Sequence, residues 1–183
     1  MVNKSVSVVL STYAEDNPEE LRDAIRSMLH QTLTPEELIL VKDGPLSDSL
    51  ETVIKNQQKM KPEIVRTINF DHNRGRAKAR AVGTSASEYE FVAIMDSDDI
   101  SVPTRLEREI DFLIENPEIA SVGGFVQEFD TNPEEPYATR YVPTAPDEVR
   151  KFAKRRSPIN HPTVMFRKDA VLTVGNYKDI DRG

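Results

Sequence analysis

The chain has 183 residues, no cysteine and a formal net charge of −7 at pH 7. This length fits one domain with a sizeable core. The missing cysteines exclude disulfides and thiolate metal sites, and the negative charge argues against nucleic acid, because a phosphate backbone needs a basic face. No charged and apolar leader precedes the first strand, and no apolar run reaches the roughly 18 residues that span a bilayer. We therefore expect a cytoplasmic protein without a transmembrane segment.

Short apolar runs alternate with helical patterns through the first hundred residues. Buried strands are predicted at 6–12, 38–41, 64–70 and 91–95. Helices are predicted at 18–29, where Pro18 opens the first turn, and at 48–59 and 76–85, where apolar residues recur with helical spacing. Strands and helices that alternate in this way predict an α/β fold with a mostly parallel sheet flanked by helices.

The remaining residues are less regular. A helix over 104–115 and a strand over 119–129 are predicted, followed by a proline-rich loop over 130–147 that encloses a short strand near 137–142. The segment 151–156 is a small basic cluster in an acidic chain. It is typical of a solvated helix end, and the alternative is contact with a diphosphate or with the anionic inner face of a membrane.

Three carboxylates directly follow the fourth predicted strand, in Asp96-Ser97-Asp98-Asp99. Ligands of parallel sheets bind beyond the carboxyl ends of the strands. Like charges this close resist ionisation together, and a divalent cation with hard oxygen ligands, Mg²⁺ or Mn²⁺, removes that repulsion. Asp96 and Asp98 leave the same face of an extended segment, whereas Asp99 points away from Asp98. The alternative is an acidic N-cap for the helix that begins near Pro103.

The loops after the four parallel strands are expected to meet at one edge of the sheet. They bring carboxylates, an amide and arginines, which suit a ligand with hydrogen-bonding rings and phosphates. Asp43 could accept from a base N–H, and Arg80 could reach an anionic group. Each motif also has an ordinary interpretation: Asp43-Gly44 is a common turn, and His161 alone is more often a structural histidine.

Together these segments resemble the family 2 glycosyltransferases, inverting enzymes with the GT-A fold that use nucleotide-sugar donors. The matching segments are 8–13, Asp43-Gly44, Asn73-Arg74-Gly75 with Ala79-Arg80, 96–99, and 161–168. The resemblance implies one GT-A domain over 1–183, with a nucleotide-sugar and metal-binding half at 1–100. The segment 101–183 would begin the acceptor side, with a mixed-sheet extension after the Asp-x-Asp motif.

The resemblance also implies residue roles. Asp98 and Asp96 would bind Mn²⁺ or Mg²⁺, and Asp43 would bind the nucleotide base. Other contacts to the nucleotide-sugar are implied for Thr12, Tyr13, Glu15, Asn73, Gly75, Arg80, Asp96 and Ser97. A UDP- or dTDP-linked sugar is favoured as donor, and a glycan or a lipid-linked molecule as acceptor. Two positions depart from the common pattern, Lys42 before the base-binding aspartate and Ala81 after Arg80.

In this family the general base follows a segment resembling Gly175-Asn176-Tyr177. We therefore expect the chain to be an N-terminal donor-binding portion, with the base beyond Gly183 and only Asp179 and Asp181 as nearby substitutes. Such a portion would bind the donor with little or no transfer, as a non-catalytic nucleotide-sugar binding module would. A nucleotidyltransferase remains a rival, although it usually has a glycine-rich basic loop where this chain has 14–17.

Overall fold

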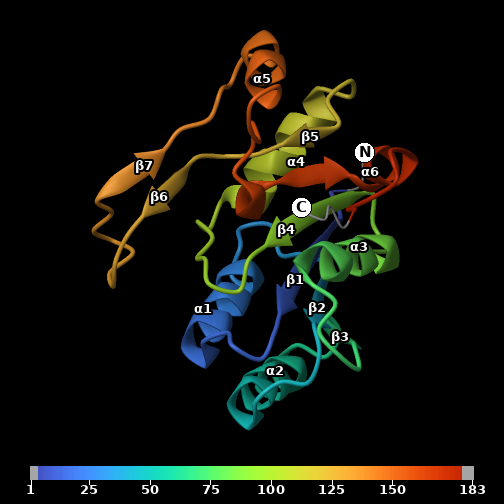
Figure 1. The fold of residues 1–183 in the computed structure, drawn as a ribbon, viewed down its shortest axis with the longest axis vertical. Helices are drawn as coiled ribbons and strands as arrows, with labels where there is room; N and C mark the ends of the chain where they lie inside the picture. Colours follow the sequence, from blue (N-terminus) through green and yellow to red (C-terminus); the bar gives the residue numbers. More distant parts are fainter. Residues whose placement is uncertain (1–3, 179–183) are drawn as a thin grey trace.

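The computed structural model describes residues 4–178 and contains a central sheet between two helical layers (Figure 1). The sheet has six strands in the order β3-β2-β1-β4-β8-β5. Its parallel strands are β1 (Val6–Thr12), β2 (Glu37–Lys42), β3 (Val65–Asn69) and β4 (Phe91–Met95). The strands β8 (Met165–Arg167) and β5 (Ser121–Val122) extend it antiparallel. The expected mostly parallel α/β fold with a mixed-sheet extension is confirmed.

Helices cover both faces of the sheet, which explains why its central strands are apolar throughout. One face packs against α1 (Pro18–Leu29), α2 (Asp48–Met60) and α4 (Arg105–Glu115). The other packs against α3 (Arg76–Ala86) and α6 (Lys168–Thr173). Successive residues of β1 belong to opposite cores, Val8 and Leu10 to the first and Val9 to the second. Through residue 115, the elements expected from the sequence differ by at most one residue at either end.

The expected strand over 119–129 is wrong. Gly123 and Gly124 divide it, and the second part, β6 (Val126–Glu128), pairs with β7 (Ala138–Arg140) in a separate two-stranded sheet. A Cβ at Gly123 would lie 2.6 Å from the Ile159 side chain, so the segment around Ile159 packs too closely on this position to leave room for a side chain. The short strand expected near 137–142 is confirmed as β7.

Residues 146–153 form an exposed helix, α5 (Pro146–Ala153), whose first turn lies within the stretch expected to be a loop. The basic cluster covers the last turn of α5 and the turn that follows. Every residue of the cluster except Phe152 is exposed, which agrees with the solvated helix end expected from the sequence. In Figure 1 the helix stands above the sheet, and the β6–β7 hairpin lies below it to the left.

The helix α3 approaches the sheet closely because Ala79 and Gly83 face it. A Cβ at Gly83 would lie 2.4 Å from Val9 Cγ1 and 3.3 Å from Val41 Cγ2. Overpacking of this kind costs about 1–3 kcal/mol, more than the helix-propensity gain of about 1 kcal/mol. Gly83→Ala is therefore expected to lower the free energy of unfolding, measured by urea denaturation. Gly124→Ala is the control, because its Cβ would meet nothing nearer than 3.9 Å; equal effects would contradict this packing argument.

Candidate functional site

The carboxyl ends of β1, β2, β3 and β4 share one edge of the sheet, since these strands are parallel. Loop contacts join neighbouring strands there. The backbone N–H of Asp43 donates to the Thr12 carbonyl at 2.8 Å, and the backbone N–H of Arg74 donates to Asp43 Oδ1 at 2.6 Å. Asp43 is buried. One of its oxygens therefore fixes the loop after β3, and the sequence did not anticipate this use.

The turn after Asp43 requires glycine. Gly44 has φ +96°, and a Cβ there would lie 2.8 Å from the backbone nitrogen of Asn73. The Asn73 side chain accepts from the Gly75 N–H at 3.0 Å, and Gly75 precedes α3 with φ +84°. Both segments form turns, as the turn interpretation predicted, and the two loops pack backbone to backbone, which the sequence did not predict.

Three carboxylates gather where β4 ends. One oxygen from each of Asp96, Asp98 and Asp99 lies within 4.8 Å of the other two. Burial, with Asp98 and Asp96 adding to it, raises the pKa of Asp99 to about 6. A Mg²⁺ or Mn²⁺ ion would neutralise this mutual repulsion, and both ions prefer oxygen ligands such as these carboxylates. The cluster therefore fits the predicted divalent metal.

Two expectations about this segment are wrong. Asp99 does not point away from Asp98, because 97–98 form a turn in which the two-residue period of a strand no longer applies. The acids also do not cap the next helix, since the N-cap of α4 is Thr104 and no side chain bonds there. The cluster thus has no capping role.

Arg80 holds one of these acids from α3. Its Nη2 lies 2.5 Å from Asp96 Oδ1, and its Nε is buried without a hydrogen-bond partner. A buried donor without a partner is costly, so a ligand oxygen that accepted from Nε would be stabilised. This geometry suits the anion contact expected of Arg80.

The remaining predicted residues of the first loop lie at the same edge. Thr12 is buried, and its Oγ1 has no hydrogen-bond partner. Tyr13 and Glu15 are exposed, and the Tyr13 N–H donates to the Asp16 carboxylate at 3.2 Å. Ser97 lies in the turn between the acids. Asp179 and Asp181, the substitutes proposed for the base, lie outside the described residues.

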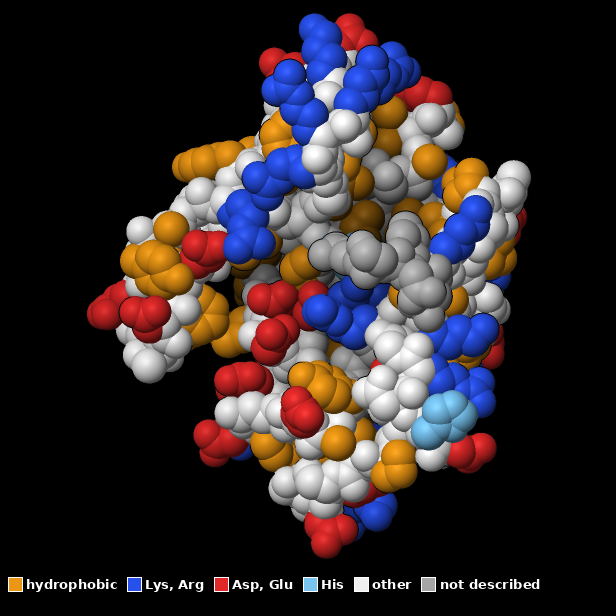
Figure 2. All heavy atoms as spheres, viewed as in Figure 1, with side chains coloured by type: hydrophobic (Ala, Val, Ile, Leu, Met, Phe, Trp, Pro, Cys, Tyr) orange, Lys and Arg blue, Asp and Glu red, His pale blue; other side chains and the backbone are white. Residues whose placement is uncertain are grey.

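A cavity of about 560 Å³ adjoins Asp96 and Arg80. Its other side comes from the extension, through Arg140, Tyr141, Phe152, Arg156 and His161, among others. Figure 2 shows acidic and basic side chains next to each other near the centre of the face below α5. Sequence analysis missed this cavity, because it forms only when residues 140–161 fold back over the sheet edge.

His161 contributes both packing and cavity surface. Its ring meets Tyr177 edge-on at 5.5 Å between centroids, as expected for a structural histidine. Burial, and then the neighbouring Arg80, lower the pKa of His161 to about 4. The ring is therefore neutral at pH 7, and its buried Nδ1 has no hydrogen-bond partner.

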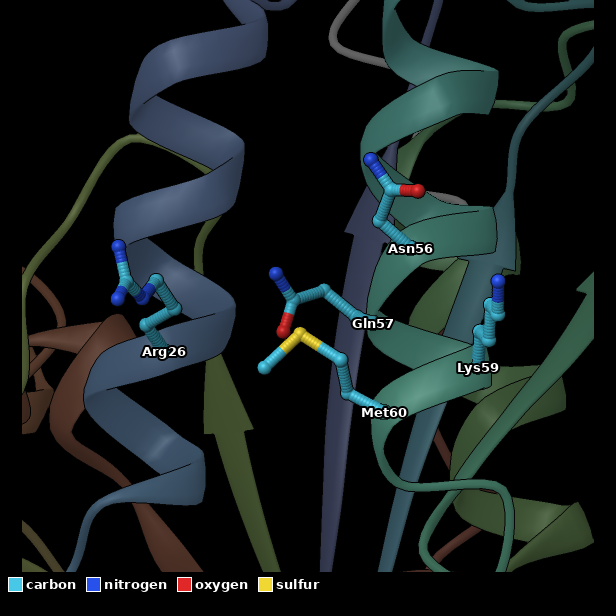
Figure 3. Close-up of a pocket in the computed structure, with 5 residues that line it drawn as sticks. All are labelled: Arg26, Asn56, Gln57, Lys59 and Met60. Atoms are coloured by element: carbon cyan, nitrogen blue, oxygen red, sulfur yellow. The ribbon is translucent and has the colours of Figure 1, made fainter.

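A second hollow, of about 580 Å³, lies between α1 and α2. Figure 3 shows Gln57 and Met60 of α2 projecting into this gap opposite Arg26 of α1. These residues belong to the last turns of their helices, toward the edge where the strands begin. None of the described residues that line this hollow is a carboxylate, unlike those around the cavity beside Asp96. Within residues 4–178 no helix has the length and apolar character to cross a bilayer.

Comparisons with known proteins show the family of the chain. The family described as "Glycosyl transferase family 2" matches residues 7–174. An uncharacterized glycosyltransferase of Haemophilus influenzae is 37% identical over 174 residues, 95% of this chain and 64% of that protein. The amylovoran biosynthesis glycosyltransferase AmsE of Erwinia amylovora is 35% identical, over 94% of this chain and 63% of its own.

A third relative is the Escherichia coli UDP-Gal:alpha-D-GlcNAc-diphosphoundecaprenol beta-1,3-galactosyltransferase, 31% identical over 93% of this chain and 61% of that protein. The chain thus spans less than two thirds of the length of these relatives. A mannosyltransferase from Pyrobaculum calidifontis, solved with GDP-Man and Mn²⁺, shares the fold with a TM-score of 0.67 at 14% identity, covering 93% of this chain and 46% of the other. The sheet order, the acidic turn after β4 and these matches together show that the chain belongs to glycosyl transferase family 2 and has the GT-A fold.

Proposed function

We propose that this chain carries the donor-binding part of an inverting glycosyltransferase that uses a nucleotide-diphosphate sugar, UDP- or dTDP-linked, with Mn²⁺ or Mg²⁺. The observation that carries the proposal is the cluster of Asp96, Asp98 and Asp99 at the end of β4. Asp98 and Asp96 would hold the cation, which when bound neutralises the charge of the leaving diphosphate. The name of the E. coli relative includes UDP-Gal, which supports a uridine nucleotide as the donor.

The chain's own residues would then position the donor. Tyr13 and Glu15 follow the carboxyl end of β1 and would line the base and ribose pocket. Asp43 would bind the base with the oxygen that Arg74 leaves free. Arg80, with an unpaired Nε, would bind a donor oxygen. Asn73, Gly75, Thr12 and Ser97 complete the proposed set around this edge.

We further propose a glycan or lipid-linked acceptor. The name of the E. coli relative includes a diphosphoundecaprenol acceptor, and the cavity beside Asp96 would give such an acceptor a place next to the donor site. A lipid-linked acceptor would place the reaction at the inner face of a membrane. The acceptor hydroxyl must lose a proton as it attacks the anomeric carbon, so transfer also requires a general base.

Titration calorimetry with UDP tests the donor site. Binding is expected in Mn²⁺ and is expected to disappear in EDTA, because the diphosphate then faces unneutralised carboxylates. Equal affinity in the two buffers would contradict the proposed metal site. A turnover assay with UDP-galactose on the same sample then separates a transferase from a module that binds nucleotide-sugar without turning it over. The expectation that residues 1–183 transfer little stays a prediction until that assay.

A further inference from the structure

Four arginines surround the cavity beside Asp96, although the chain as a whole is acidic. They are Arg76 and Arg80 of α3, Arg140 of β7, and Arg156 after α5. Among the residues of 4–178 that line the cavity, Asp96 is the only carboxylate. The cavity therefore has a local excess of positive charge that the net charge of −7 conceals.

Two of these guanidinium groups are already neutralised and two are not. Arg80 pairs with Asp96, and Arg140 pairs with Glu128 across the β6–β7 hairpin. Within residues 4–178, neither Arg76 nor Arg156 has a carboxylate partner, and the Arg156 guanidinium lies over the Phe152 ring, 5.5 Å from its centroid. These two arginines keep their donors available for an anion.

The same cavity has an apolar wall. Tyr141, Val142, Phe152 and Ile159 line it beside the arginines. Tyr141 is 71% exposed and packs edge-on against the exposed Phe125, with ring centroids 5.0 Å apart. Guanidinium groups and apolar rings thus lie next to each other, which suits a ligand whose anionic group is joined to a hydrocarbon chain.

We infer that this cavity binds the diphosphate of a lipid-linked acceptor, a second diphosphate besides that of the donor. Arg76 and Arg156 bind its phosphate oxygens, and Tyr141 and Phe152 contact the first part of the hydrocarbon chain. The inference rests on the proposed function, because the cavity adjoins Asp96 of the metal cluster. It adds a site for the acceptor's anionic group on residues that the donor does not need.

Calorimetry in EDTA isolates this site, since the donor site depends on metal. The probes are inorganic pyrophosphate and farnesyl diphosphate, the latter below the concentration at which it forms micelles. Both are expected to bind, and farnesyl diphosphate more tightly because of the apolar wall. Arg76→Ala and Arg156→Ala are each expected to weaken binding roughly tenfold, the usual effect of removing a charged hydrogen bond.

Arg155→Ala is the matched control, because Arg155 is exposed beside Arg156 and is not among the lining residues. Equal weakening by Arg155→Ala and Arg156→Ala would show diffuse surface attraction and overturn the inference. Absence of binding, or equal affinity for the two probes, would also overturn it.

The two proposals fail separately. Loss of UDP binding in Mn²⁺ with farnesyl diphosphate binding retained would count against the proposed function alone. The reverse result would count against the acceptor site alone. Urea denaturation of each variant confirms that the comparison is made between folded proteins.

Discussion

Replacing Asp98 with Asn is expected to abolish Mn²⁺-dependent binding of UDP while leaving the protein folded. Asparagine keeps the shape of the side chain but removes the charge that the cation needs. Asp98 is exposed and has no hydrogen bond or ion pair among the described residues, so its loss should cost little stability. Calorimetry with UDP in Mn²⁺, with urea denaturation alongside, measures both effects.

Asp130→Asn is the matched control, because it changes the net charge equally from an exposed loop position. Retained metal-dependent binding in Asp98→Asn would show that the ligand is wrongly assigned. The sequence pattern favoured a milder effect for Asp99→Asn, on the ground that Asp99 points away. The structure removes that reason, since its carboxylate lies within 4.8 Å of both neighbours, and Asp99→Asn is expected to weaken metal binding as well.

The second large effect is expected at Arg105, which is buried beneath the acidic turn. Its Nε lies 3.1 Å from Glu109 Oε1, and its Nη2 donates to the carbonyl of Ile94 at 2.9 Å and to that of Val164 at 3.3 Å. Arg105→Met leaves the Glu109 carboxylate buried without its partner. Breaking a buried pair in this way costs about 3–5 kcal/mol, which urea denaturation at pH 8 should show.

The loss should be smaller at pH 6. Burial already raises the pKa of Glu109 to about 7 against the opposing charge of Arg105, and removing that charge raises the pKa further. The folded variant then keeps a proton that unfolded Glu109 releases above about 4.5, so its stability falls as the pH rises. Arg105→Met/Glu109→Leu should recover much of the loss, whereas exposed Arg108→Met should cost little. A loss independent of pH would contradict this account.

The sequence was most informative where one physical signal dominated. Continuous apolar runs such as 91–95 predicted the buried strands, because both faces of the sheet are covered. Helical spacing in 18–29 predicted one of the helices that cover it. The acidic turn after β4 could be recognised because nothing else accounts economically for three carboxylates there. The pair Gly123-Gly124, by contrast, is a turn signal that the prediction of a strand over 119–129 passed over, and no local pattern reports the close approach of Ile159 to Gly123.

The buried pair of Arg105 and Glu109 had a weak signal. The two residues are four apart and flank Leu106, which faces the core, so their side chains lie on the inward side of α4. Charged residues at such spacing usually lie on a solvated face, and sequence reasoning therefore passed over them. Arg156 belongs to the basic cluster 151–156, for which the sequence left contact with a diphosphate open as an alternative. Arg140 had no such signal, because its approach to Asp96 depends on the path of the chain after β6.

The pairing of β4 with β8 limits how the chain could be divided or exchanged. Val92 lies opposite Phe166, and the Ile94 N–H donates to the Val164 carbonyl at 2.9 Å. Removal of residues after 100 would leave β4 as an open edge with unpaired backbone groups, which invites aggregation. The acidic turn 96–99 thus owes its support to both halves of the chain. A chimaera that exchanged residues 101–183 for those of a relative would have to preserve this strand pairing before it could alter acceptor choice.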